Sequence, residues 1–280
     1  MKYTTFTKLK ALFISIRPKT TPLGMISVYI GGLVAGAAYT SPKLFLAVIT
    51  TFFITAASMT YNDYFDWQID KINHPQRPIP QGIITPKEML YFSIILFALG
   101  SIISFFINML SFVLILVGIL LLNLYELYSK NRGILSNITV AFISAMSFTF
   151  GGAAVNNPFS TVILSTMTFF VILGREIIMD IRDTEGDKTI RRSLPVQIGK
   201  KNASYVACIF LLISLILTPF PYLLNILNIG YIIIIIPVGF LTMIGVVQTL
   251  RDVNNAAFSA SLIRIALAIA LVSFIIGIVF

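Results

Sequence analysis

The chain has 280 residues, of which 57% are hydrophobic and only 11% are charged. Soluble domains carry about twice that share of charged residues, so this composition excludes an ordinary soluble protein. The net charge of +9 is explained by membrane topology and anionic lipid headgroups, and it gives no reason to expect a nucleic-acid partner.

Apolar runs of about 20 residues, the length that a helix needs to cross a bilayer, recur along the whole chain. They are expected to be helical because lipid offers no partners for backbone amides. Runs such as 232–236, IIIII, lack the alternation of a membrane β-barrel. We therefore predict an all-α membrane protein, a bundle of about nine transmembrane helices in one membrane-embedded domain, 1–280. The expected spans are 20–39, 43–62, 88–107, 111–127, 134–153, 159–178, 203–221, 229–250 and 261–280.

Basic residues fall almost entirely on one side of this predicted bundle. The N-terminus and the even-numbered connections carry them, whereas the odd-numbered connections contribute only Lys43. By the positive-inside rule, the N-terminus and the even-numbered connections face the cytoplasm. We expect a multi-pass protein of the cell membrane whose C-terminus lies outside.

An acidic stretch, NDYFDWQID at residues 62–70, follows the second expected span. Asn62, Asp66 and Asp70 are four residues apart, so a helix places them on one face. Asp63 lies about one helical step from this stripe and could be a ligand or a neighbour of the ligands. Like charges at such spacing destabilise a helix unless a cation neutralises them.

A second acidic stretch, GREIIMDIRDTEGDK at residues 174–188, follows the sixth expected span on the same predicted side. Its acids recur at steps of four, three and four residues, which forms another stripe on a helix: Glu176, Asp180, Asp183 and Asp187. The two stretches hold eight of the 11 acidic residues of the chain. Solvated or ion-paired acids would explain one such stripe, but they explain two poorly.

The ligand chemistry of these stretches suits a hard divalent cation such as Mg²⁺ or Ca²⁺. The chain has one histidine, His74, and its one cysteine, Cys208, lies inside an expected span, so a zinc site is not expected. Two facing stripes would form an acidic mouth at one end of the bundle. Metal ions held there can bridge carboxylates to an anionic substrate, and a diphosphate is the natural guest.

These motifs resemble those of a known family, the intramembrane UbiA-type prenyltransferases. Residues 62–70 fit the NDxxDxxxD motif, and DIRDTEGD at residues 180–187 fits the second, DxxDxxGD-like motif. The segments IRPK at 16–19 and NHPQRPIPQG at 73–82 are similar to a branch that makes archaeal-type ether lipids. The resemblance implies Mg²⁺-dependent transfer of a geranylgeranyl group from geranylgeranyl diphosphate to the hydroxyl of geranylgeranylglyceryl phosphate, a lipid acceptor.

The stripes and the resemblance together give the candidate site residues. The expected metal ligands are Asn62, Asp63, Asp66, Asp70, Asp180, Asp183 and Asp187, and the expected catalytic group is Asp66, Asp70, Asp183 and Asp187. Candidates for contacts to the diphosphate or to the acceptor are Arg17, Lys19, Arg77, Tyr128, Lys130, Arg132, Asn137 and Lys188. Many relatives carry a YxxxK pattern after the fourth span. Here the stretch is LYELYSKNRG at 124–133, in which either Lys130 or Arg132 could serve.

Two other interpretations stay open. A member of the same family could prenylate an aromatic acceptor, such as a quinone precursor. An ion-coupled transporter also carries acids in its spans, although it places them near the bilayer midplane. The sequence leaves the oligomeric state and the prenyl chain length open.

Overall fold

The computed structural model describes residues 3–18, 20–187 and 191–279. The elements of this part are helices, joined by turns and loops. In chain order they are α1 (Thr5–Ser15), α2 (Thr21–Val34), α3 (Pro42–Asn73), α4 (Pro86–Phe105), α5 (Met109–Leu124), the π-helical turn η1 (Tyr125–Ser129), α6 (Ile134–Ala154), the 3₁₀ turn η2 (Pro158–Thr161), α7 (Val162–Asp187), α8 (Leu194–Ile198), α9 (Lys200–Leu217), α10 (Phe220–Leu223), α11 (Ile229–Arg251), the 3₁₀ turn η3 (Val253–Asn255) and α12 (Ala256–Val279).

Capping side chains mark where several of these helices begin. Thr85 and Glu88 form a capping box at the start of α4, in which each side chain accepts the backbone N–H of the other residue. Asn108 and Asn228 accept backbone N–H groups at the starts of α5 and α11. These side chains satisfy N–H groups that have no partner within the helix, so the local sequence fixes the helix starts.

Eight helices in the described part of the chain are long and apolar enough to cross a membrane: Pro42–Ile72, Pro86–Phe105, Met109–Ser129, Ile134–Ala154, Pro158–Asp187, Lys200–Leu223, Ile229–Arg251 and Val253–Val279. The first expected span, 20–39, differs. Its helix, α2, has only 14 residues, which is about 21 Å at 1.5 Å per residue and short of a hydrocarbon core of about 30 Å. Gly36, at φ +94°, follows the end of this helix. The prediction of about nine spans is therefore revised to eight and a short apolar helix.

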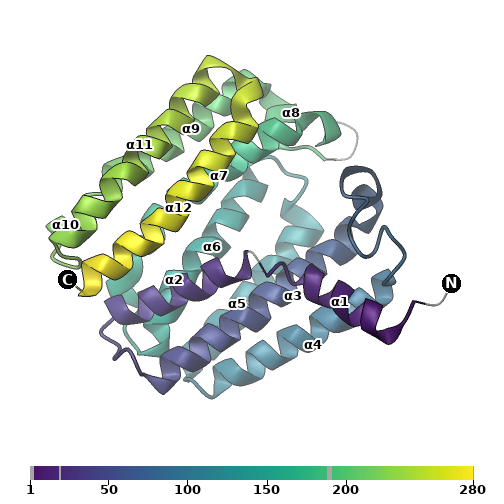
Figure 1. Ribbon diagram of the computed structural model, residues 1–280, viewed down its shortest axis with the longest axis horizontal. Coiled ribbons are helices and arrows are strands. Elements are labelled where there is room, and N and C mark those ends of the chain that lie inside the picture. The colour runs from purple at the N-terminus through teal and green to yellow at the C-terminus, as the bar shows by residue number, and fades with distance from the viewer. Residues whose placement is uncertain (1–2, 19, 188–190, 280) are drawn as a thin grey trace.

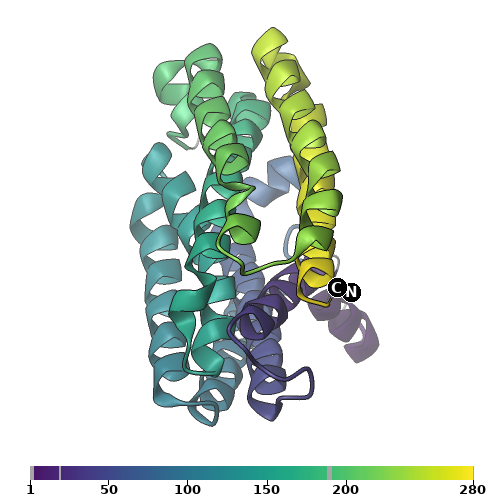
Figure 2. The same cartoon turned by 90° about the vertical axis from the view of Figure 1, so that its left-hand side faces the viewer.

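The long helices run side by side from one end of the bundle to the other (Figures 1 and 2). Helix α3 packs on α4, α6 on α7, α7 on α9 and α11 on α12. Figure 1 places α1 and the C-terminal end of α12 at opposite ends of the bundle. With this up-and-down order, α3, α5 and α7 all end on the side where α1 lies.

Two glycines allow α2 and α6 to touch backbone to backbone. A Cβ atom on Gly31 would lie 2.2 Å from the carbonyl oxygen of Phe148, and a Cβ atom on Gly151 would lie 2.0 Å from that of Val28. Any side chain at either position would force the helices apart. This contact holds the short helix α2 in the bundle.

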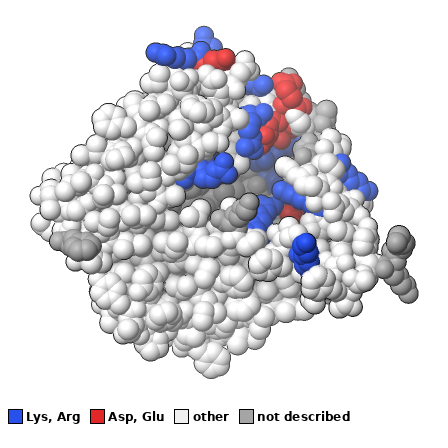
Figure 3. Space-filling view, viewed as in Figure 1, with Lys and Arg blue, Asp and Glu red and all other residues white. Residues whose placement is uncertain are grey.

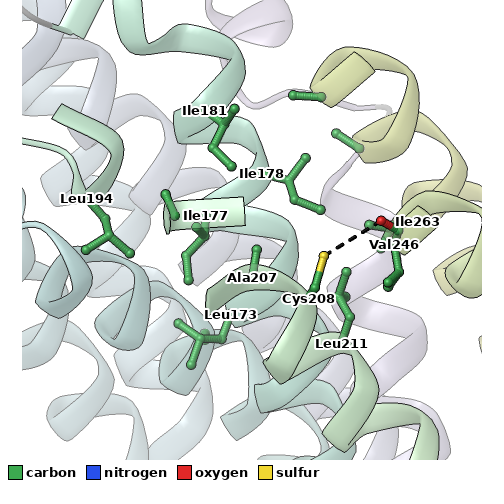
Figure 4. Packing of buried hydrophobic residues seen from close by; sticks show 14 residues of the cluster. Leu173, Ile177, Ile178, Ile181, Leu194, Ala207, Cys208, Leu211, Val246 and Ile263 are labelled. Atoms are coloured by element: carbon green, nitrogen blue, oxygen red, sulfur yellow. Dashed lines mark hydrogen bonds between the residues drawn. The ribbon is translucent and has the colours of Figure 1, made fainter. Parts of the chain in front are cut away.

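A cluster of buried side chains packs α7 against α9, α11 and α12 (Figure 4). Ile177, Ile178 and Ile181 of α7 are all buried in it. Cys208 lies in the same cluster, where its Sγ is 3.8 Å from the carbonyl oxygen of Val246. Because one face of α7 is buried in this way, the rotation of the helix is fixed, and with it the direction of the acidic stripe between the isoleucines.

Candidate active site

The first acidic stretch lies in the last turns of α3, where arginines from two other segments hold its carboxylates. Arg17, between α1 and α2, places Nη2 2.9 Å from Oδ1 of Asp63. Arg77, in the loop after α3, donates to the same Asp63 oxygen at 3.3 Å and to Oδ2 of Asp70 at 2.6 Å. The two aspartates are seven residues apart, two helical turns, so one guanidinium links carboxylates at both ends of the stretch. The stripe is thereby tied to the segments before α2 and after α3.

The end of α5 supplies the partners of the other first-stretch residues. Glu126, in η1, accepts a hydrogen bond from Nδ2 of Asn62 at 2.8 Å and one from Nζ of Lys130 at 2.6 Å. The same Nζ lies 2.7 Å from Oδ1 of Asp66. Burial by itself lowers the pKa of Lys130, but the carboxylates of Glu126 and Asp66 outweigh it, so this pKa is raised. The ammonium group therefore stays charged at neutral pH.

The π-helical turn decides which cation after the fourth expected span reaches the acids. The N–H of Lys130 bonds to the carbonyl of Tyr125, five residues earlier, and its ammonium lies 5.6 Å from the centre of that ring. Arg132 instead stacks on Tyr128 at 3.5 Å and donates to its hydroxyl at 2.6 Å. Tyr128 is 53% exposed. Of the two cations that the sequence left open, Lys130 contacts the acidic stripe, whereas Arg132 pairs with an exposed tyrosine.

The second stretch lies along the mouth end of α7. Asp180 is buried, and its Oδ2 accepts a hydrogen bond from Nδ2 of Asn137 at 2.8 Å. Nη1 of Arg191 lies 3.7 Å from Oδ1 of the same aspartate. Arg191 also donates to the carbonyl of Lys130 at 2.9 Å and to Oγ of Ser136 at 2.6 Å. Asn137 thus orients a carboxylate, and Arg191 joins the start of α6 to α7.

Arg191 is influenced by both acidic stretches. Burial by itself lowers its pKa, but the charges of Asp180, Asp187 and Asp66, together with Tyr125, outweigh burial, so the pKa is raised. Asp66 belongs to the first stretch and the other two aspartates to the second. The geometry agrees: Arg191 contacts Asp180 and the carbonyl of Lys130, and the Lys130 ammonium contacts Asp66.

The remaining predicted residues differ in their surroundings. Asp183 is exposed, and both its oxygens accept from the neighbouring Arg182, at 2.7 and 2.6 Å. Asp187 is the last residue of α7. Lys19 and Lys188 lie outside the described residues.

Sequence reasoning missed two members of this network, Glu126 and Arg191. Glu126 carried a signal, because a lone carboxylate within an apolar span is costly unless it is paired or functional. No sequence signal distinguishes Arg191 from the other basic residues after the second stretch. Its role depends on the fold of the loop that follows α7.

The acids fit a divalent metal ion in ligand chemistry, since hard carboxylate oxygens are what Mg²⁺ prefers. As the side chains lie, no group of three or more Asp, Glu, His or Cys residues within residues 3–18, 20–187 and 191–279 is arranged to hold a metal ion. Each first-stretch aspartate instead contacts Arg17, Arg77 or Lys130. Metal binding at this mouth therefore requires these ion pairs to open.

A cavity of about 380 Å³ lies one helical turn from the charged mouth. Ser58, Leu122 and Ile172 line it, and each stands four residues before a polar mouth residue on its helix. Several of its hydroxyls, such as those of Thr51 and Ser144, donate to a carbonyl of their own helix. These hydroxyls need no partner from a ligand, so the cavity suits a hydrocarbon chain.

The outer surface agrees with this division between mouth and membrane. On the face shown in Figure 3, most basic and acidic side chains gather around one hollow, and most of the remaining surface carries no charge. The fold and the site thus define a membrane-embedded helical bundle with a charged mouth above an apolar cavity.

Residues 24–268 match the UbiA prenyltransferase family, and the chain belongs to this family of multi-pass membrane proteins. It is 37% identical to the digeranylgeranylglyceryl phosphate synthase of Methanococcoides burtonii over 262 residues, which cover 91% of this chain and 93% of the relative. It is 35% identical to the synthase of the same name from Pyrococcus furiosus, with 96% and 98% of the two chains covered.

Solved structures agree with this assignment. A structure described as that of digeranylgeranylglyceryl phosphate synthase superposes with a TM-score of 0.81 at 34% identity, covering 97% of this chain and 99% of the other. A UbiA homologue from Archaeoglobus fulgidus, bound to DMAPP and Mg²⁺, superposes with a TM-score of 0.70 at 19% identity, covering 92% and 98%. The second likeness concerns the fold alone.

Proposed function

We propose that this chain transfers a geranylgeranyl group from geranylgeranyl diphosphate to the hydroxyl of geranylgeranylglyceryl phosphate, a step in archaeal-type ether phospholipid synthesis. The observation that carries the proposal is the likeness, over nearly the full length of both chains, to proteins named digeranylgeranylglyceryl phosphate synthase. The charged mouth one turn from an apolar cavity supports it, because a prenyl diphosphate has a charged head and a hydrocarbon tail.

In this reaction the bond between the allylic carbon and the diphosphate oxygen breaks, and its electron pair leaves with the diphosphate. The acceptor's hydroxyl oxygen then bonds to the allylic carbon, and its proton leaves with the released diphosphate as hydrogen diphosphate. Mg²⁺, when bound, neutralises the charge that gathers on the departing diphosphate. The residues that would hold Mg²⁺ are Asn62, Asp63, Asp66 and Asp70 of α3 and Asp180, Asp183 and Asp187 of α7.

The bases of the mouth have a second role in this proposal. Lys130, Arg17 and Arg77 each pair with a first-stretch carboxylate, and each can turn to a phosphate oxygen when that carboxylate takes another partner. Glu126 keeps the Lys130 ammonium beside Asn62 during this exchange. Such preorganised cations stabilise a leaving anion without the reorganisation that water needs.

The proposal also includes an orientation in the membrane. The mouth and the N-terminus face the cytoplasm, as the positive-inside rule predicts. The C-terminus then lies on the outer side. A cysteine-labelling scan from the two sides of intact vesicles tests this orientation.

The experiment that tests the function compares three acceptors with the purified chain in detergent. Geranylgeranyl diphosphate is the donor, and the acceptors are geranylgeranylglyceryl phosphate, its dephosphorylated alcohol and 4-hydroxybenzoate. We expect efficient prenylation of the phosphate, much slower reaction of the alcohol and none of the aromatic acid. Prenylation of 4-hydroxybenzoate without that of the glycerol phosphate would leave the family intact and overturn the proposed acceptor.

A further inference from the structure

Two arginines stand at the rim of the cavity on the side of α7 and α12. Arg175 of α7 lies four residues after Val171, and Arg264 of α12 lies three residues before Leu267. Both of these apolar residues line the cavity. Residues three or four apart share a helix face, so each arginine stands one turn from the cavity lining. Because α7 and α12 are in contact, the two arginines flank the same part of the rim.

The acidic stripe of α7 has a basic neighbour on the same helix. Arg175 and Arg182 are seven residues apart and so share one face, rotated by about 100° from the face of Glu176 and Asp183, because a helix turns 3.6 residues per turn. The acidic face interacts with Asn137 and Arg191. Arg264 belongs to α12, which is in contact with α7. Helix α7 therefore presents carboxylates, which can bind a metal ion, and guanidinium groups, which can bind an anion, on adjacent faces.

The hydrogen-bonding capacity of these two arginines is not used up. Arg175 donates from Nη1 to Glu176 at 2.9 Å, but its Nε is buried without a hydrogen-bond partner in the part of the chain that the structure describes. Arg264 has a contact of 3.4 Å with Oγ of Ser261 and, within the described ranges, no ion pair. Buried N–H groups nearly always have a partner. Arg175 pairs with the carboxylate of Glu176, and Arg264 adds a second positive charge at this rim.

Arg264 differs from the bases on the opposite side of the mouth, each of which forms an ion pair. Arg17, Arg77 and Lys130 are all bound to carboxylates of α3. That side combines acids and bases, as a metal-bridged diphosphate requires. The α7–α12 side offers an excess of guanidinium groups, which suits an anion that binds without a metal. Figure 3 shows basic side chains on both sides of the hollow.

We propose that Arg175 and Arg264 bind the phosphate of the acceptor lipid. This inference rests on the proposed function and adds the site at which the second substrate is recognised. A phosphomonoester accepts paired hydrogen bonds from a guanidinium, and two arginines match its double charge. A phosphate bound here would lie beside the acidic stripe of α7, because the basic and acidic faces of this helix are adjacent, and the acceptor's hydroxyl could then reach the mouth. Phospholipid headgroups carry related phosphate chemistry, so the test must separate the two sources.

The test uses R264Q and R175Q, with R251Q as a matched control at the end of α11. We expect both rim variants to raise the KM for geranylgeranylglyceryl phosphate at least tenfold, while the KM for geranylgeranyl diphosphate changes less than threefold. With the dephosphorylated alcohol as acceptor, the rim variants should match the unaltered chain, because the group that the arginines bind is missing. R264K should recover part of the loss, and R251Q should have no effect on any of these constants.

A binding measurement separates the acceptor from bulk lipid. Isothermal titration of geranylgeranylglyceryl phosphate into each variant, in zwitterionic nanodiscs with chelator present, should show the same tenfold weakening. If the rim binds headgroups only, R264Q will reduce the response to added phosphatidic acid and leave acceptor binding unchanged, which overturns the proposal. Arg264 is exposed, so R264Q stays informative even if R175Q, next to Glu176, fails to fold. If the unaltered chain does not use the glycerol phosphate, the proposed function fails first and independently of either variant.

Discussion

Replacing Lys130 with methionine tests the site most directly, because this cation joins α3 to the end of α5. Methionine keeps a long unbranched side chain and removes the ammonium that lies 2.7 Å from Asp66 and 2.6 Å from Glu126. The side chain of Lys130 is only 13% exposed and that of Glu126 only 4%. The substitution therefore leaves a buried carboxylate without its cation.

The magnitude follows from this burial. Removing one partner of a buried ion pair costs about 3–5 kcal/mol, and K130M should fall near the lower end because Glu126 keeps its hydrogen bond to Asn62. The turnover number should fall at least about 10²-fold, the scale for loss of one preorganised electrostatic group. Adding E126Q to K130M should recover much of the stability and none of the turnover, because the amide removes the unpaired charge but supplies no cation.

Arg132 provides the control for this prediction. It lies on exposed Tyr128, and an exposed cation–π contact is worth about 0.5–1 kcal/mol, so R132M should keep near-normal turnover and stability. The assays are diphosphate release from geranylgeranyl diphosphate with Mg²⁺ and the thermal unfolding midpoint, both in detergent. Normal turnover in K130M together with a large loss in R132M would show that the wrong cation has been placed at the substrate.

The remaining predictions concern the metal, the acids and the helix packing. Chelation with EDTA should abolish diphosphate release, and added Mg²⁺ should restore it; full turnover in chelator would argue against the metal. D66A and D183A should each lower the turnover number at least about 10²-fold in a folded protein, whereas E185A, off the acidic stripe, should have a smaller effect. G151A should lower the thermal midpoint by the equivalent of about 1–3 kcal/mol, because its Cβ would lie 2.0 Å from a backbone carbonyl of α2. G118A, where a Cβ meets nothing within 4 Å, should leave the midpoint unchanged or raise it.

The sequence predicted the parts of this molecule that depend on local periodicity. The repeated apolar runs indicated the long helices, and the spacing of Asp66 and Asp70 indicated an acidic stripe at the end of one of them. The short helix α2 escaped this reasoning because the run 20–39 carries no charged residue, while the chain leaves the helix after Val34. Hydrophobicity records what can lie in lipid and does not record where the backbone turns.

The partners of the acids could be predicted only in part. Arg17 and Arg77 were candidates because the sequence places them near the mouth, but nothing in the sequence shows that Arg77 bridges two aspartates. The choice between Lys130 and Arg132 depended on the fold around η1, where the N–H of Lys130 bonds to the carbonyl of Tyr125 and its ammonium contacts both Glu126 and Asp66. A pattern that assumes a regular α-helix pairs Tyr128 with Arg132 and overlooks Tyr125 with Lys130.

The origin of these partners links the site to the fold. The α3 carboxylates are paired with cations from the segment before α2, the loop after α3 and the residue that follows η1. Acidic stripes are unfavourable on an isolated helix. The repulsion between the carboxylates of the first stretch is therefore offset only when these three segments have folded against α3. The groups that stabilise the mouth before substrate arrives are then the same cations that the proposed reaction requires. A substrate that supplies phosphate oxygens for the bases while its metal ions occupy the carboxylates exchanges one set of paired charges for another, and leaves no buried charge unpaired at either stage.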